Sequence, residues 1–129
     1  MNGPYARLHH EILQAQAGTS APLRVYLTRR LPDRDVALSA ERLFGHYHLE
    51  QTTLRNGILL YVNLRTRRFA VARDAGADAA LGMEYWRELS QCLRDDLLST
   101  HHELALRMAV RTLGISLARL FPADDNGVE

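Results

Sequence analysis

The sequence contains no lysine, so all 16 of its basic residues are arginine. Arginine presents fixed, forked donors that suit carboxylate and phosphate groups. The absence of lysine favours no particular site, however, and we interpret it as codon bias in a GC-rich genome. With 15 acidic residues the net charge is only +1, which argues against strong attraction of the whole chain to nucleic acid or to membranes.

Cysteine is also scarce, because Cys92 is the single cysteine among the 129 residues. A disulfide within the chain is therefore excluded, and the composition fits a reducing compartment. Cys92 lies between Leu89 and Leu93, in a stretch with the helical spacing of apolar residues. That setting predicts a packed, inert cysteine rather than a nucleophile.

Several recognisable segments and motifs are missing. No stretch approaches 18 consecutive apolar residues, and residues 1–10 lack the apolar region of a secretion signal, so we expect no transmembrane segment and a cytoplasmic location. No P-loop, Gly-rich dinucleotide fingerprint or G-x-S-x-G elbow occurs. The length fits one domain, which we place at residues 1–122, with a flexible tail at 123–129.

The hydrophobic pattern predicts an α/β protein with the element order α-β-α-β-β-α-α. An apolar run from Ile58 to Leu64, interrupted only by Asn63, is typical of a strand covered on both faces. A strand, a helix and a further strand in succession favour a small mixed sheet between helices, and hence a three-layer α/β/α sandwich. The other predicted strands are residues 23–28 and 69–72, and the predicted helices begin near residues 4, 33, 83 and 100.

Arginines gather around the predicted hairpin: Arg65, Arg67 and Arg68 lie in its turn, and Arg55 and Arg73 flank it. Such a patch can capture an acidic partner, an anionic lipid or a phosphate. It can equally be a solvated hairpin tip whose charges protect a sheet edge, which is the reading that a short arginine run favours. No aromatic residues are interleaved with these arginines, so a nucleic-acid platform is not expected.

Aspartates follow two of the predicted strands: Asp33 and Asp35 after the first, and Asp74 and Asp78 after the hairpin. Sites in α/β folds form at strand ends, where a carboxylate pair can hold a hard cation. The alternative is that these residues cap helices and turns, which fits Asp33 after a proline and Asp78 before two alanines. The six histidines lack the spacing of a zinc site, and no metal site is predicted.

The order of several short motifs resembles the TPM domain family, in its short, anchor-free bacterial form. The resemblance rests on Arg-Asn-Gly and the apolar run at 55–62, the charged turn at 65–68, and the second strand ending in Asp-Ala-Gly at 69–76. Further matches are Ala-Glu-Arg-Leu-Phe at 40–44, Tyr-Trp at 85–86 and Phe-Pro at 121–122, so that about residues 23–122 are covered. The resemblance implies an α/β/α sandwich. Some members are described as acid phosphatases and others bind calcium, and bacterial members often accompany a LemA-type membrane protein.

The chain departs from the family where the metal-binding or phosphatase members are acidic. Residues 52–55 are Thr-Thr-Leu-Arg and residues 65–67 are Arg-Thr-Arg. Cations beside an oxygen-ligand site repel a divalent ion, so a calcium site is not expected here. Asn56, Gly57, Asp74 and Gly76 do match the family pattern, and Gly57 is expected to adopt a backbone conformation closed to other residues.

We therefore predict a non-catalytic TPM-type binding module without a cofactor, acting with a protein partner at the inner face of a membrane. The resemblance implies a LemA-type membrane protein or another TPM protein as that partner. One alternative is a weak acid phosphatase that uses Asp33, Asp35 or Asp74 while arginines clamp the phosphate. Another is a calcium-binding regulator. The predicted binding residues are Arg55, Asn56, Gly57, Arg65, Arg67, Arg68, Asp74 and Gly76.

Overall fold

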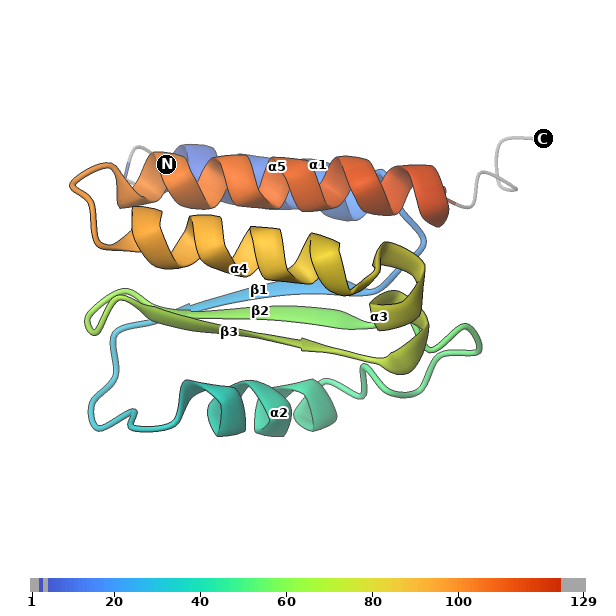
Figure 1. The fold of residues 1–129 in the computed structure, drawn as a ribbon, viewed down its shortest axis with the longest axis horizontal. Coiled ribbons are helices and arrows are strands. Elements are labelled where there is room, and N and C mark those ends of the chain that lie inside the picture. Colours follow the sequence, from blue (N-terminus) through green and yellow to red (C-terminus); the bar gives the residue numbers. More distant parts are fainter. Residues whose placement is uncertain (1–2, 4, 124–129) are drawn as a thin grey trace.

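The computed structural model describes residues 3 and 5–123 (Figure 1). Residues 1, 2, 4 and 124–129 lie outside this part, and with them most of the predicted tail. The helices are α1 (Ala6–Ala17), α2 (Val36–His46), α3 (Ala75–Leu81), α4 (Met83–Leu97) and α5 (His102–Leu120). The strands are β1 (Leu23–Thr28), β2 (Ile58–Asn63) and β3 (Arg68–Arg73).

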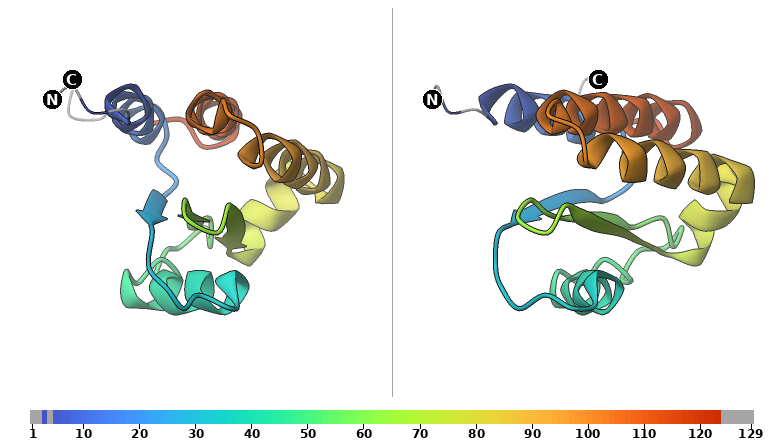
Figure 2. Two further views of the ribbon diagram at one scale, coloured as in Figure 1. Left: turned by 90° about the vertical axis from the view of Figure 1, so that its left-hand side faces the viewer. Right: turned by 60° about the vertical axis from the view of Figure 1, so that its left-hand side comes forward.

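The three strands form one mixed sheet in the order β1-β2-β3. β1 and β2 are parallel, with Leu23 opposite Ile58, and β2 and β3 are antiparallel, with Ile58 opposite Arg73. α2 covers one face of the sheet, and α1, α4 and α5 lie on the other (Figures 1 and 2). The predicted three-layer α/β/α sandwich and its element order are confirmed, and the structure adds one short helix, α3, after the hairpin.

β2 forms the centre of both cores, because all of its residues are buried. Ile58, Leu60 and Val62 pack with the layer that contains α1, α4 and α5. Leu59 and Tyr61 point to the other face and pack with α2. This alternation explains the continuous apolar run in the sequence, since each face of the strand has its own covering layer.

Two features of the helices differ from, or extend, the expectation from sequence. Cys92 is exposed on α4, so the prediction that it packs in the core was wrong. Its neighbour Leu93 is buried, and Cys92 lies about 100° further round the helix, outside the apolar face. None of the helices in the described part of the chain is long and apolar enough to cross a membrane.

Candidate functional site

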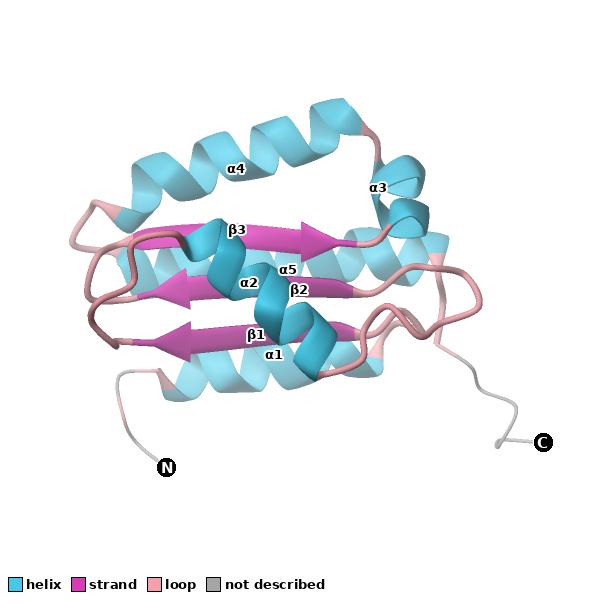
Figure 3. Cartoon of the chain, turned by 90° about the horizontal axis from the view of Figure 1, so that it is seen from below, coloured by secondary structure: helices cyan, strands magenta, loops and turns pink. Residues whose placement is uncertain are grey.

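Strand direction decides which of the predicted site residues can meet. β1 and β2 run in the same direction, and β3 runs the opposite way (Figure 3). Asp33 follows β1 in the chain and Asp74 follows β3, so the two aspartates lie at opposite ends of the sheet. Asn63, at the end of β2, contacts Asp33. Ile58, at the other end of β2, pairs with the residue before Asp74. The two aspartates are therefore separated by the length of β2, about 16 Å at 3.3 Å per residue, and cannot share one catalytic or metal centre.

Asp33 is buried and accepts side-chain hydrogen bonds from three residues. Tyr61 Oη and Asn63 Nδ2 donate to its Oδ2 at 2.5 and 2.8 Å, and Ser39 Oγ of α2 donates to its Oδ1 at 2.8 Å. Burial favours the protonated acid, but the hydrogen bonds and the charge of Arg30 outweigh it, so the pKa of the Asp33 carboxyl lies below its usual value. This carboxylate joins the loop after β1 to both β2 and α2.

Asp74 is satisfied in a different way. Arg55 donates to both of its oxygens, from Nε at 2.7 Å and from Nη2 at 2.9 Å. The N–H of Ala75 also donates to Oδ1 at 2.8 Å, so that Asp74 caps α3. These hydrogen bonds, led by those from Arg55, hold the pKa of the Asp74 carboxyl below its usual value although burial acts in the opposite direction.

Asp35, the third candidate for a catalytic carboxylate, is also used structurally. Its Oδ1 accepts the backbone N–H of Leu38 at 3.1 Å, which makes Asp35 the N-cap of α2. Asp78 does not cap a helix. It lies in the first turn of α3, where its Oδ1 accepts from Arg73 Nε at 2.7 Å. Each of the predicted aspartates thus has a defined partner within the fold.

A calcium ion does not fit the donor set at Asp74. Both oxygens of this carboxylate already accept hydrogen bonds, and the Arg55 guanidinium takes the place of a cation beside them. Among residues 3 and 5–123, no group of three or more His, Cys, Asp or Glu side chains is arranged to hold a metal ion. The chemistry of this end of the sheet is that of an ion pair.

A turn that spans residues 52–55 precedes Asn56 and Gly57. Arg55 N–H donates to Thr52 O at 3.2 Å, and Arg55 itself has a φ of 54°. Gly57 does not have a positive φ, so the expected reason for a glycine at this position was wrong. Asn56 is buried next to Gly57, and its backbone N–H donates a hydrogen bond to the hydroxyl of Thr52 at 3.2 Å.

Close approach of backbone segments explains the two matching glycines instead. A Cβ on Gly57 would lie 2.3 Å from the carbonyl oxygen of Leu49. A Cβ on Gly76 would lie 2.0 Å from the carbonyl oxygen of Leu54. Both distances are far below a van der Waals contact. Gly57 and Gly76 therefore let the loop before β2 and the start of α3 pack directly on neighbouring backbone.

The arginines of the hairpin fall into two groups. Arg67 is structural, because its Nη1 donates to Leu97 O at 2.8 Å and so ties the turn to the end of α4. Arg73 pairs with Asp78 and its guanidinium lies 4.5 Å from the centre of the Trp86 ring. Arg65 and Arg68 are exposed, and neither forms an ion pair within the described residues.

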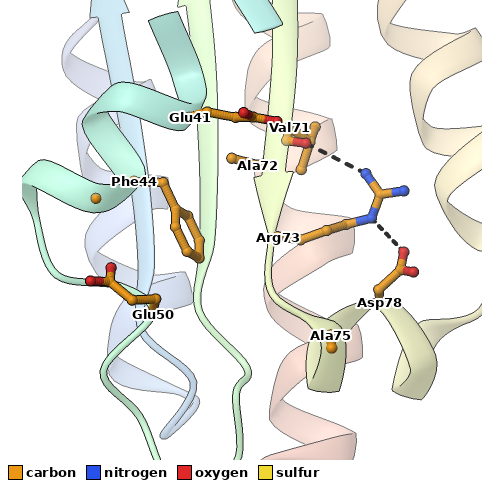
Figure 4. A pocket seen from close by; sticks show the side chains of 9 residues that line it. Glu41, Phe44, Glu50, Val71, Ala72, Arg73, Ala75 and Asp78 are labelled. Atoms are coloured by element: carbon orange, nitrogen blue, oxygen red, sulfur yellow. Dashed lines mark hydrogen bonds and ion pairs between the residues drawn. The ribbon is translucent and has the colours of Figure 1, made fainter. Parts of the chain in front are cut away.

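Two hollows follow the outer edge of β3. One of about 470 Å³ lies between β3 and α4 and is lined by Arg68, Ser90 and Arg94 among others. The second, of about 600 Å³, lies between α2 and the end of β3, where Glu41 and Glu50 line it (Figure 4). Val71 and Arg73 line both hollows, so the two continue one another along the strand. We call this surface, defined by Arg68, Val71, Arg73, Arg94, Glu41 and Glu50, the β3 edge groove.

Three charged residues of the β3 edge groove were missed from the sequence: Arg94, Glu41 and Glu50. Arg94 and Glu41 occupy the polar sides of amphipathic helices, and Glu50 follows a helix, where charged residues are common. Their nearness to β3 depends on how α2 and α4 lie against the sheet. No local sequence signal carries that information, whereas Arg68 was found through its position in the hairpin turn.

Comparisons with known proteins agree with the fold and the motifs. A family model described as the TPM domain matches residues 4–113. The NMR structure of the BA42 protein from the psychrophilic bacterium Bizionia argentinensis superimposes with a TM-score of 0.75 at 24% identity, covering 91% of this chain and 80% of BA42. That likeness concerns the fold. No curated protein matches the chain.

Proposed function

The chain belongs to the TPM domain family, and from that premise we propose that it is a non-catalytic module that binds a partner protein through the β3 edge groove. The observation that carries the proposal is the open edge of β3, which is flanked by charged side chains that have no partner within the described fold. Arg68 and Arg94 lie along one half of this edge. Interfaces that expose unpaired charge beside free backbone are suited to a complementary protein segment.

The candidate carboxylates support binding rather than turnover. An in-line phosphoryl transfer needs an acid or base and a charge clamp around one phosphate. Asp33 is saturated by Tyr61, Asn63 and Ser39, and Asp74 is held by Arg55, at opposite ends of the sheet. The same arrangement favours a module without a calcium ion, and calorimetric titration with millimolar Ca²⁺ should give no binding heat.

Photo-crosslinking in cells tests this proposal. Ser90 lines the β3 edge groove and carries no charge, so a photo-crosslinking amino acid can replace it while all charged side chains of the groove are kept. We expect a discrete covalent adduct with one protein. The same amino acid at Leu13, which is 51% exposed on α1, serves as the control and should give none.

A charge reversal then links the adduct to the groove. Combining the Ser90 crosslinker with Arg68→Glu and Arg94→Glu should lower the adduct yield about tenfold, because two attractive charges become repulsive. Equal adducts at Ser90 and Leu13, or no adduct at either, would contradict the proposal. The membrane-adjacent setting derives from the family resemblance alone. Identification of the captured partner as a LemA-type membrane protein or another TPM protein would support it, and a partner unconnected with membranes would refute it.

A further inference from the structure

The hydrogen-bond pattern of the hairpin shows which backbone groups of β3 face outward. Asp74 N–H donates to Gly57 O at 3.1 Å, so these two residues form a hydrogen-bonded pair of the antiparallel ladder. Such pairs alternate along a ladder with pairs whose N–H and C=O groups point away. Residues 70 and 72 therefore bond to β2, and the backbone groups of Phe69, Val71 and Arg73 point to the open edge.

This edge is free of any further strand within the described residues, because β3 is the last strand of the sheet. Part of it is covered by the chain itself. Arg73 Nη1 lies 3.5 Å from Val71 O, at the limit of a hydrogen bond, while Arg73 Nε pairs with Asp78 (Figure 4). The backbone N–H of Val71 has no partner in the sheet. The outward N–H and C=O groups of Phe69, Val71 and Arg73 can therefore bond to an added strand, and only the weak contact between Arg73 Nη1 and Val71 O has to break.

The charges along the groove are ordered. Beside the start of β3, Arg68 and Arg94 line the hollow next to α4. Beside the second half of β3, from Val71 to Arg73, Glu41 and Glu50 line the hollow next to α2. None of these four side chains forms an ion pair with another described residue. The groove is therefore basic at one end and acidic at the other, and it complements a segment with the opposite order of charges.

The position of α4 limits what can occupy the groove. Seen along the direction that looks onto the sheet, α4 lies outside β3 rather than over β1 or β2 (Figure 3), and the end view shows it above and beyond the strand (Figure 2). Two copies joined antiparallel through β3 would keep their α4 helices on the same side of the joined sheet, where the helices would meet. A single extended segment avoids this collision.

We propose that an extended segment of the partner protein adds to the sheet as a strand antiparallel to β3, with basic residues in its N-terminal half and acidic residues in its C-terminal half. This inference rests on the proposed binding function and specifies its mode, which is β-strand addition. An antiparallel segment begins beside Arg73 and ends beside Arg68. Its basic half then lies next to Glu41 and Glu50, and its acidic half next to Arg68 and Arg94.

Two peptides of equal composition test the charge order. The probe is the capped peptide Lys-Thr-Lys-Val-Ala-Val-Glu-Thr-Glu, and the control is Glu-Thr-Glu-Val-Ala-Val-Lys-Thr-Lys. In NMR titrations of the labelled protein, we expect the probe to shift the amide signals of Phe69, Val71 and Arg73 and to bind about tenfold more tightly than the control. Equal affinities, tighter binding of the control, or shifts confined to other regions would overturn the proposal.

A proline substitution tests the backbone contact. Val71→Pro removes an outward N–H without breaking a bond to β2, which edge strands tolerate, whereas Val71→Ala keeps the N–H and trims the same side chain. We expect Val71→Pro to weaken probe binding at least about tenfold, and Val71→Ala to change it about twofold at most. Retained binding by a folded Val71→Pro protein would refute strand addition.

A charge exchange guards against the case in which Val71→Pro fails to fold. The double variant Glu41→Arg with Arg68→Glu changes two exposed side chains and leaves one positive and one negative side chain at each end of the groove. It should therefore abolish the difference in affinity between the two peptides. An unchanged ranking would refute the proposal.

Sedimentation tests whether a second copy of the chain occupies the groove. A concentration-dependent dimer that Val71→Pro abolishes would identify a second copy as the occupant and would overturn the proposal. If the Ser90 adduct still forms in the Val71→Pro protein, the proposed binding function holds but strand addition is refuted. If no adduct forms in the protein without Val71→Pro, both the binding function and strand addition are refuted.

Discussion

The two ends of the sheet each hold a buried carboxylate, and they hold it by opposite means. At one end Asp33 accepts hydrogen bonds from neutral groups: the hydroxyls of Tyr61 and Ser39 and the amide of Asn63. At the other end Asp74 is paired with Arg55, whose side chain is 59% exposed while that of Asp74 is 8% exposed. The carboxylates are alike in burial, and their partners differ in access to water.

This difference decides what each carboxylate contributes. If Asp33 is removed, the buried hydroxyl of Tyr61 loses its acceptor, which costs the full desolvation of a polar group. If Asp74 loses its charge, the Arg55 guanidinium returns to water at little cost. The stability of the Asp74 end should therefore depend less on the Arg55–Asp74 ion pair than on the direct backbone packing at Gly57 and Gly76.

The largest effect is expected from Gly76→Ala. A Cβ at this position would lie 2.0 Å from Leu54 O and 2.7 Å from Arg55 O, and backbone cannot yield as a flexible side chain can. We expect a loss of about 4 kcal/mol or more in the free energy of unfolding, measured by urea denaturation. Gly45→Ala is the matched control, because a Cβ there meets nothing within 4 Å. Within helix α2 it should be neutral or stabilise by up to about 1 kcal/mol. Similar destabilisation by both changes would contradict the role of close backbone approach.

At the other end, Asp33→Ala should be the most damaging side-chain change. It leaves the Tyr61 hydroxyl without an acceptor in a buried site, and we expect a loss of about 3 kcal/mol in unfolding free energy. Asp35→Ala, which removes only the cap of α2, should cost about 1 kcal/mol.

A double-mutant cycle separates the orphaned hydroxyl from the loss of the carboxylate itself. Adding Tyr61→Phe to Asp33→Ala removes the group that lacks a partner, so the double variant should be at least about 1 kcal/mol more stable than the sum of the single effects. Strict additivity would show that the Tyr61–Asp33 hydrogen bond is not what makes this end sensitive.

The sequence could reveal the layers of this fold but only part of its groove. The apolar run in β2 has a local cause, because each of its residues needs cover on one face or the other, and the pattern is readable without tertiary information. The helix α3 was missed because Ala75–Leu81 is short and contains a glycine, and its start depends on Asp74 as a cap. Cys92 was misassigned because it lies next to the apolar stripe and not within it.

The roles of the hairpin arginines illustrate the same limit. Arg65, Arg67 and Arg68 are equivalent in sequence, as members of one charged turn. Arg67 alone reaches the carbonyl of Leu97, because the end of α4 lies beside the turn. Glu41 and Arg94 come to the edge of β3 by the same kind of long-range packing. Such contacts follow from the arrangement of layers, which a single sequence predicts only in outline.

The smallest effect is expected from Asp74→Asn, and its pH dependence gives the sharpest contrast between the two ends. Asparagine is a good helix cap and can still accept from Arg55, so the loss at pH 7 should be less than about 1 kcal/mol. The pKa of the Asp74 carboxyl is lowered in the folded state. Its stabilising contribution is therefore complete above the unfolded pKa of about 3.9 and is lost as the pH falls through the folded pKa. Urea denaturation of both proteins should show the difference between them shrinking below about pH 4, since Asp74→Asn lacks this titration. A difference that grows toward acid pH, or a loss at pH 7 as large as that of Asp33→Ala, would show that the exposed guanidinium of Arg55 does not return to water as its position implies.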